Sequence, residues 1–273
     1  MQTRRFAPMR EWDFAPESGG TFIPESVGTL PGIRILISGC LYPYENIKVI
    51  HIKPFPTKSE KPNSILKQRG IIGAKKTNLA KYYLLKGSQT KITSLVKSKA
   101  KLIKGSTSKQ IVINIMKWEH NNLQYQGGAY EKRTRTSHEI IQSGIATGCI
   151  DFGLVFVTLA RAKGISASFT ETVKEEWIYT MVQQQKWIQN MEGHIFSEVY
   201  LPEKKEWIVV DPTANKITQR TETGYYLLNG KRYLLFDRGL DSWDIGLENM
   251  TQFADAVKAR FYIEGNKPKY FLY

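Results

Sequence analysis

The sequence predicts an α+β fold in which a helical first half packs on an antiparallel sheet built from the second half. Apolar residues recur at helical spacing between about residues 93 and 163. Beyond residue 166, short apolar runs are separated by turn residues, as in a sheet of hairpins. This order of helices and strands is typical of an α+β domain. The 273 residues, 41% of them apolar, can bury a sizeable core, and no run approaches the ~20 apolar residues of a membrane span.

The composition indicates two regions along the chain. Residues 1–57 read as an irregular arm rich in Gly, Pro and Ser, with two short strand-like runs, GIRILI and NIKVIHI. Residues 58–273 are expected to form the folded domain, with its core at about 90–217. No secretory signal is visible, and two cysteines cannot form a disulfide framework. Reduced thiols and a cytoplasmic location are therefore expected.

Three helices are expected in the first half of this core. Residues 93–104 place apolar side chains on one side and lysines on the other. Two capping-box patterns, Thr107 with Gln110 and Thr136 with Glu139, predict the starts of the other two helices.

A fourth helix is expected over residues 149–163, ending at Gly164. The run CIDFGLVFVTLARAK is apolar on nearly all sides. A helix of this kind must be covered by other elements, so we expect it to be the central buried helix of the domain.

The second half reads as strands. SASFTETV at 166–173 is one, and HIFSEVYL at 194–201 forms a hairpin with EWIVVD at 206–211 through the turn 202–205. GYYLLNGKRYLLF at 224–236 predicts a second hairpin with an Asn-Gly turn.

Two further segments show helical character. Apolar residues from Met250 to Phe261 recur at helical spacing near the C-terminus. The stretch KEEWIYTMVQQQKWIQNMEG, residues 174–193, contains Trp177 and Trp187. It is either a flap over a substrate groove or an amphipathic helix packed on the core.

The net charge of +14 is concentrated in one block, residues 58–104. This block has thirteen Lys and Arg residues and a single acidic residue, Glu60, and so holds +12 of the total. It could meet an anionic partner such as nucleic acid or a charged surface. The alternative is a solvated face, which is favoured because the block lacks a recognisable nucleic-acid motif.

Cys149 follows a Thr-Gly pair and begins the buried helix. Its sulfur would face unpaired backbone N–H groups and the positive end of the helix dipole. Such a position, with a cation nearby, lowers a thiol pKa and makes the sulfur nucleophilic. Taken alone, the residue is more simply read as a packed core cysteine.

His194 and Asp211 lie on neighbouring strands of the predicted hairpin. If 202–205 form the turn, Leu201 pairs with Glu206, and Asp211 falls within about two residues of His194. Pro212 cannot donate to a ladder, so the strand should end at the aspartate. A histidine oriented by a carboxylate is the base and acid that a thiol nucleophile needs.

With these residues in view, GCIDFGLVFVTLARAKGI followed by GHIFSEVYLPEKKEWIVVDPT resembles the transglutaminase-like superfamily, relatives of the papain-type cysteine proteases. The resemblance covers about residues 90–217 and implies that the nucleophile stands at the start of a buried helix packed on an antiparallel sheet. It implies Cys149 as nucleophile, His194 as base and Asp211 as the residue that orients the histidine.

The resemblance implies cysteine-dependent acyl transfer on amide bonds of a protein or peptide substrate, through a thioester. Water as the second nucleophile would make the protein a peptidase or amidase, which we favour. An amine would make it a protein-glutamine transglutaminase. The remaining alternative is a binding module of the same fold without chemistry.

The sequence leaves the second oxyanion donor open among Gln142, Tyr125 and Trp118. No metal or cofactor is predicted, because the histidines lack metal-ligand spacing and no His-Glu-x-x-His or phosphate-loop pattern is present.

Overall fold

The computed structural model describes residues 76–127, 133–184, 192–220, 225–263 and 267–268. The chain divides into two compact units, residues 1–48 and 49–273, and every described residue lies in the second. The strand-like runs predicted in the N-terminal arm lie outside the described residues. The division of the chain after residue 57 stays a prediction.

The first half of the described chain is helical, and three of its helices, α3, α4 and α5, begin at threonine caps. The Thr93, Thr107 and Thr136 side chains each accept a hydrogen bond from a backbone N–H of the first turn. The bounds are α2 (Lys76–Tyr82), α3 (Ser94–Leu102), α4 (Ser108–Asn122) and α5 (Ser137–Ser143), with the two-residue parallel strands β1 (Gln124–Tyr125) and β2 (Ile145–Ala146).

One of the two predicted capping boxes is complete. At the start of α5, Thr136 accepts from the Glu139 backbone N–H, and the Glu139 carboxylate accepts from the Thr136 backbone N–H. At the start of α4, Thr107 accepts from the Gln110 N–H as predicted, but the Gln110 amide donates to Asn114 along the helix. This second pattern is therefore a plain threonine cap.

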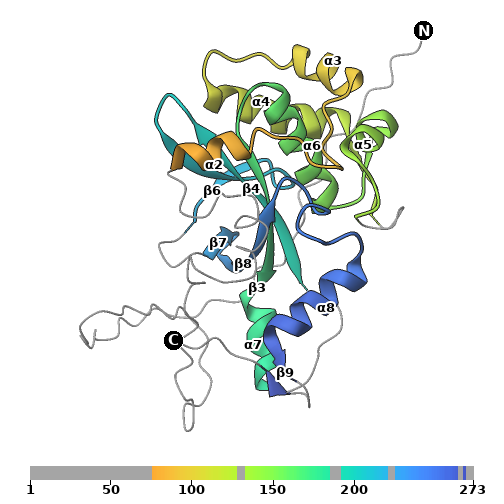
Figure 1. Ribbon diagram of the computed structural model, residues 1–273, viewed down its shortest axis with the longest axis vertical. Coiled ribbons are helices and arrows are strands. Elements are labelled where there is room, and N and C mark those ends of the chain that lie inside the picture. Colours follow the sequence, from red (N-terminus) through yellow and green to blue (C-terminus); the bar gives the residue numbers. More distant parts are fainter. Residues whose placement is uncertain (1–75, 128–132, 185–191, 221–224, 264–266, 269–273) are drawn as a thin grey trace, which may run out of the picture. The chain divides into compact units, whose positions relative to one another are not determined.

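The long helix α6 (Cys149–Ala162) is the centre of the domain, as predicted. Every residue from Ile150 to Arg161 is buried. The helix packs on α3, α4 and α5 and on strands β3 and β4 (Figure 1). It approaches β4 closely at Gly153, where an added Cβ would lie 2.4 Å from Ile195.

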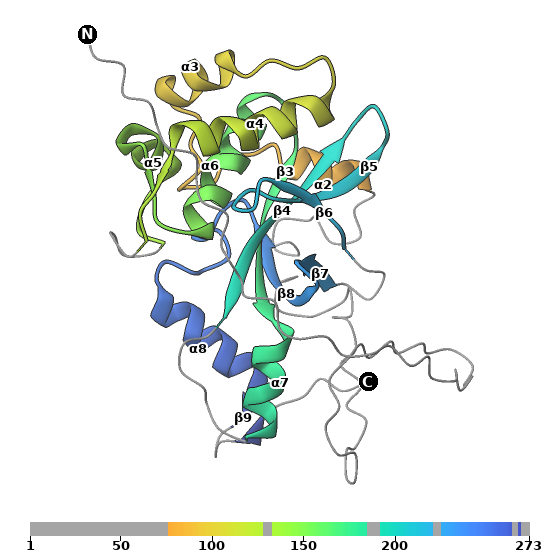
Figure 2. The ribbon, with the colours of Figure 1, turned by 180° about the vertical axis from the view of Figure 1, so that it is seen from behind.

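The second half forms a six-stranded antiparallel sheet in the order β6-β5-β4-β3-β8-β7. Its strands are β3 (Ala167–Lys174), β4 (Gly193–Leu201), β5 (Glu206–Asp211), β6 (Lys216–Thr218), β7 (Tyr225–Leu228) and β8 (Lys231–Gly239). From behind, β5 and β6 are seen beside β4 (Figure 2). The sheet curls until its edges meet, because Leu227 donates to the Gln219 carbonyl and Arg220 bridges to Tyr226.

Both predicted hairpins have the expected register. Leu201 pairs with Glu206, so the four residues Pro202–Lys205 make the turn. Leu228 pairs with Lys231. The two residues of the second turn, Asn229 and Gly230, have φ of 49° and 76°, the left-handed pair that a two-residue hairpin turn needs.

Two helices pack at the far end of β3 and β8. They are α7 (Glu175–Gln183) and α8 (Met250–Phe261). Trp177 from α7, Phe253 from α8 and Phe236 from β8 belong to a second apolar cluster. The part of 174–193 that is described before residue 185 is thus a helix packed on the core. The short strands β9 (Tyr262–Ile263) and β10 (Lys267–Pro268) pair after α8.

In the part of the chain that is described, no helix has the length and apolarity to cross a bilayer.

Buried polar side chains fasten the helices to the sheet. Arg161, in the last turn of α6, donates to the carbonyls of Tyr83, Ala167 and Leu240. Gln89 is fully buried, and its amide donates to the carbonyls of Arg133 and Arg135. Since buried polar groups are costly when unpaired, these bonds fix the C-terminal end of α6 and the irregular segment 133–136 that precedes α5.

The close approach at Gly153 leads to a stability prediction. Gly153→Ala should lower the free energy of unfolding by about 1–3 kcal/mol, because the new methyl group overlaps Ile195. In an unobstructed helix the same change would stabilise by roughly 0.5–1 kcal/mol. Urea denaturation measures the difference. Gly148→Ala is the control, since a Cβ there has no atom within 4 Å and should change stability by less than about 1 kcal/mol. An unchanged or raised stability for Gly153→Ala would contradict the packing described for α6.

Candidate active site

Cys149 is the first residue of α6, and the loop before it is held in place by the helix itself. The Asp151 carboxylate accepts from both the backbone N–H and the hydroxyl of Thr147, each at 2.9 Å. The same carboxylate oxygen accepts from Arg135 at 3.1 Å. Gly148 is the N-cap and has no side chain to cover the sulfur. The thiol is partly exposed at a fixed helix start.

His194 and Asp211 are joined by a hydrogen bond, as the hairpin register predicts. His194 Nε2 lies 2.8 Å from Asp211 Oδ2. Asp211 is fully buried, and its other oxygen accepts from the backbone N–H of Ala214 at 2.9 Å. The strand ends at this aspartate, where His120 Nε2 contacts the Pro212 carbonyl at 2.9 Å. The carboxylate therefore has a fixed position with both oxygens engaged.

The His194 ring is enclosed by aromatic side chains and is coupled to the cysteine. It packs edge-on against Phe196 and beside Tyr233, and its side chain is 12% exposed. Burial alone would lower the pKa of His194. Hydrogen bonds with Asp211 and with Cys149, and the charges of both, outweigh the burial and raise the pKa to about 10. The imidazolium is thus the favoured form at neutral pH.

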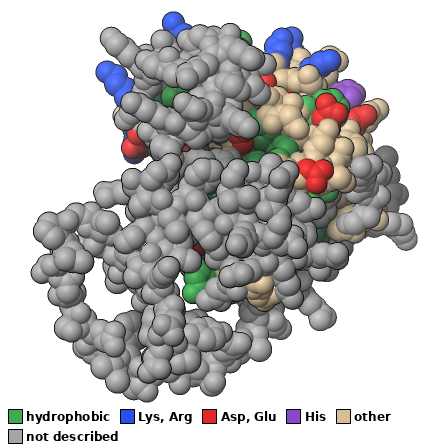
Figure 3. Space-filling model, turned by 60° about the horizontal axis from the view of Figure 1, so that its bottom comes forward, with side chains coloured by type: hydrophobic (Ala, Val, Ile, Leu, Met, Phe, Trp, Pro, Cys, Tyr) green, Lys and Arg blue, Asp and Glu red, His purple; other side chains and the backbone are tan. Residues whose placement is uncertain are grey.

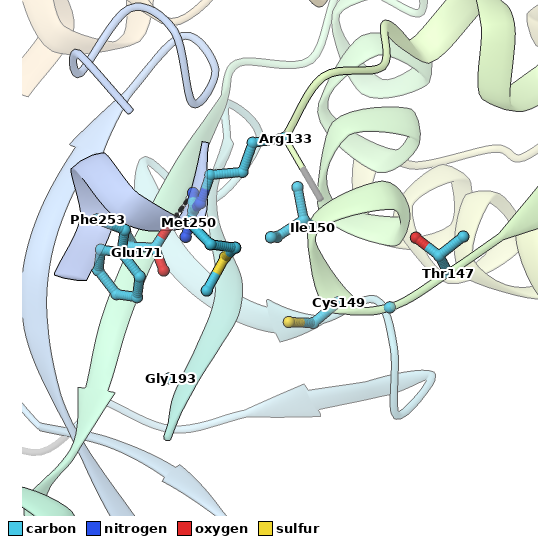
Figure 4. Close-up of a pocket in the computed structure, with 9 residues that line it drawn as sticks. Arg133, Thr147, Cys149, Ile150, Glu171, Gly193, Met250 and Phe253 are labelled. Carbon is cyan, nitrogen blue, oxygen red and sulfur yellow. Dashed lines mark hydrogen bonds and ion pairs between the residues drawn. The ribbon is translucent and has the colours of Figure 1, made fainter. Parts of the chain in front are cut away.

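A pocket opens beside the sulfur, and most of its walls were not predicted from the sequence. It offers about 100 Å³ of free space, and the residues that line it are Arg133, Thr147, Gly148, Cys149, Ile150, Glu171, Gly193, Met250 and Phe253. Figure 4 shows the Cys149 sulfur pointing toward the side of the pocket where Glu171, Met250 and Gly193 lie, with Thr147 on the other side.

The wall opposite Cys149 contains a buried ion pair. Arg133 Nη1 lies 2.7 Å from Glu171 Oε2, and both side chains are at most 2% exposed. Burial raises the pKa of Glu171, and the Arg133 charge opposes this shift. Nothing in the local sequence marks either residue. Asp151, by contrast, could have been found as an acidic residue in the first turn of a predicted helix.

None of the three candidate oxyanion donors lines this pocket. Tyr125 pairs with Ala146 on the approach to the cysteine but is 54% exposed. Gln142 is exposed on α5, and Trp118 packs against the main apolar cluster. The backbone N–H groups at the start of α6 are therefore the donors closest to the sulfur in sequence.

In the described part of the chain, no group of three His, Cys, Asp or Glu side chains is arranged to hold a metal ion.

The comparison with protein families gives one match, to a segment within the core. Residues 97–212 match the family model of the transglutaminase-like superfamily. This segment is transglutaminase-like. The transglutaminase-like segment runs from α3 to Pro212, and it includes Cys149, His194 and Asp211. The resemblance and the α+β fold expected from the sequence are confirmed, and members of the superfamily are typically cysteine enzymes.

A solved structure described as "a Putative Cysteine Protease from Cytophaga hutchinsonii" is similar at 20% identity and a TM-score of 0.45. The match covers 60% of this chain and 48% of the other, so the chain spans about half the length of that protein. No curated protein matches the chain.

The raised pKa of His194 gives a prediction with a definite sign. The pKa of His194 is higher in the folded state than its unfolded value of about 6.5. The interactions of the protonated ring with Asp211 and Cys149 therefore stabilise the fold fully below about pH 6.5. The stabilisation is lost as the pH rises through about 10. An NMR titration of the His194 ring nitrogens, assigned with His194→Gln, should show deprotonation near pH 10. Asp211→Asn should move that midpoint toward neutral pH. A wild-type midpoint near 6.5 would contradict the coupling to Cys149 and Asp211.

Proposed function

We propose that this protein is a cysteine-dependent acyl-transfer enzyme that acts on amide bonds, with Cys149 as nucleophile, His194 as acid and base, and Asp211 as the residue that orients the imidazole. The observation that supports this most strongly is the hydrogen bond between His194 and a fully buried Asp211 at the end of β5, together with the interaction of His194 with Cys149. The hydrogen bond uses Nε2 and leaves Nδ1 for the proton exchanged with the sulfur and the substrate.

The chemistry runs in two steps. The Cys149 thiolate attacks the carbonyl carbon, and the negative oxygen that forms is stabilised by backbone N–H groups at the start of α6. His194 then gives its proton to the leaving amine, the C–N bond breaks, and a thioester remains on the sulfur. The neutral imidazole takes a proton from the second nucleophile, which attacks the thioester and restores the thiolate–imidazolium pair.

We favour water as the second nucleophile and a protein or peptide as substrate. Water needs no binding channel of its own, whereas an amine acceptor must be positioned against the thioester. Transfer to an amine, as in a protein-glutamine transglutaminase, is the second candidate, because the same thioester serves both reactions.

The basic block and the cytoplasmic location stay predictions. In the described part of the block, Lys97, Lys99 and Lys101 lie on α3 and are partly or fully exposed. On the face seen in Figure 3, the visible Lys and Arg side chains gather along the upper edge. An anionic partner would bind this region with an affinity that falls as salt rises.

Product analysis of a mixed peptide library, with and without a primary amine such as methylamine, tests the proposal. We expect new peptide termini or deamidated glutamine without the amine, and amine adducts only as a minor product. Cys149→Ala should lower the rate about 10³-fold or more, since it removes the nucleophile.

Cys40→Ala is the matched control, because it removes the other thiol of the chain and should leave the rate unchanged. Predominant amine adducts would favour the transglutaminase alternative. If the wild type and Cys149→Ala give the same products at the same rate, the enzyme proposal fails and a binding module of the same fold remains.

A further inference from the structure

The ion pair between Arg133 and Glu171 forms a wall of the pocket beside Cys149 but takes no part in the proposed chemistry. Both side chains are buried, so their charges have lost their contact with water. The same two residues on the protein surface would keep that hydration and would not pay a desolvation cost. A buried ion pair is a poor source of stability, because desolvation offsets most of the attraction. Because Arg133 and Glu171 line the pocket, the ion pair is placed to contact a group of the substrate.

Arg133 is held rigidly before any substrate arrives. Its backbone has φ of 76°, and its carbonyl accepts from Gln89 Nε2 at 3.0 Å and from Trp243 Nε1 at 2.7 Å. Its guanidinium lies 4.6 Å from the centre of the Phe253 ring and donates from Nη1 to Ser242 at 2.8 Å. These contacts fix the direction of the charge.

Glu171 is fixed by the sheet. It lies on β3, where the pairing with β8 shifts by one residue between Glu171 and Thr172. Such a β-bulge redirects the side chains next to it. In Figure 4 one carboxylate oxygen of Glu171 meets Arg133, and the other points away from it.

The pocket presents hydrogen-bonding groups but no net charge. The charges of Arg133 and Glu171 cancel. Arg133 Nε is a buried donor without a partner among the described residues. The only hydrogen bond that Glu171 accepts among those residues is at Oε2, which leaves its second oxygen as an acceptor. The walls from Ile150, Met250 and Phe253 are apolar.

The ion pair and the apolar walls of the pocket select the substrate side chain that enters it by its charge. An acidic or basic side chain would bring an uncompensated charge against the apolar walls and the buried ion pair, which is unfavourable. A carboxamide offers N–H groups to Glu171 and a carbonyl oxygen to Arg133, and the apolar walls fit the methylene groups of its side chain. About 100 Å³ accommodates one small side chain.

We infer that this pocket is a specificity subsite for one uncharged, hydrogen-bonding side chain of the substrate, of the carboxamide class, and that the Arg133–Glu171 pair excludes charged side chains. The inference rests on the proposed function, because it assigns the substrate side chain that lies beside the reactive sulfur. Arg133 and Glu171 are specificity-determining residues and do not take part in the proton transfers.

Alkylation of Cys149 by three small reagents tests the charge balance without requiring turnover. Iodoacetamide is a neutral carboxamide, iodoacetate is an anion and 2-bromoethylamine is a cation. The rate constant of each reagent at Cys149 is divided by its rate constant at Cys40, which removes differences in intrinsic reactivity.

Glu171→Gln leaves the Arg133 charge unpaired and should raise the iodoacetate-to-iodoacetamide ratio about tenfold. Arg133→Gln should lower that ratio and raise the ratio for 2-bromoethylamine by a similar factor. The double variant should return both ratios to within about twofold of the wild type. Glu198→Gln is the control, because Glu198 is another buried carboxylate, paired with Arg220 and Arg238 outside the pocket. It should leave both ratios unchanged.

The peptide library gives a second readout that needs no variant. In the wild type, one substrate position should be depleted of Asp, Glu, Lys and Arg and enriched in Asn or Gln. Ratios unchanged within twofold in both single variants, or charged residues accepted equally at every position, would overturn the subsite. A wild-type Cys149 that reacts no faster than Cys40 would instead overturn the proposed function, and the reagent ratios would still report on the pocket.

Discussion

The hydrogen bond between His194 and Asp211 depends on the register of a single hairpin. A four-residue turn pairs Leu201 with Glu206, and this pairing brings the carboxylate to the same face of the sheet as the imidazole. A slip of one residue would turn Asp211 to the opposite face. The strand stops at Pro212, whose carbonyl is contacted from α4, so the carboxylate stays at the rim of the sheet.

The second constraint is the placement of α6, which brings the sulfur to that rim. Gly153 lets the helix lie close to Ile195 on β4, the strand that begins next to His194. Asp151 fixes the loop before the cysteine, and Arg161 anchors the other end of the helix to backbone carbonyls. α6 supplies more buried apolar residues to the main core than any other described element, so the helix at the centre of the core also carries the sulfur.

The sequence was sufficient for the parts of the fold that rest on local patterns. The apolar period of α6, the threonine caps and the Asn-Gly turn are each contained within a few residues, and the structure has them where they were predicted. The pairing of His194 with Asp211 could also be predicted, because a hairpin turn converts sequence separation into a register.

The pocket could not be predicted, because its walls come together only through tertiary packing. Arg133 lies in a loop, Glu171 in a strand, and Met250 and Phe253 on the last long helix, with up to 120 residues between them. The bulge that directs Glu171 depends on pairing with β8. The Gln110 half of the second capping box failed because Asn114, one turn along the helix, offers its side chain a competing acceptor.

We propose that the Cys149 sulfur, the His194 imidazole and the Asp211 carboxylate act as one unit. A double-mutant cycle on the rate of Cys149 alkylation by iodoacetamide at neutral pH tests it most directly, with variants His194→Ala, Asp211→Ala and their combination. We expect each single variant to slow the reaction at least about tenfold, and the double variant to be no slower than His194→Ala within about twofold. Losses that multiply in the double variant, or a wild-type Cys149 no faster than Cys40, would contradict it.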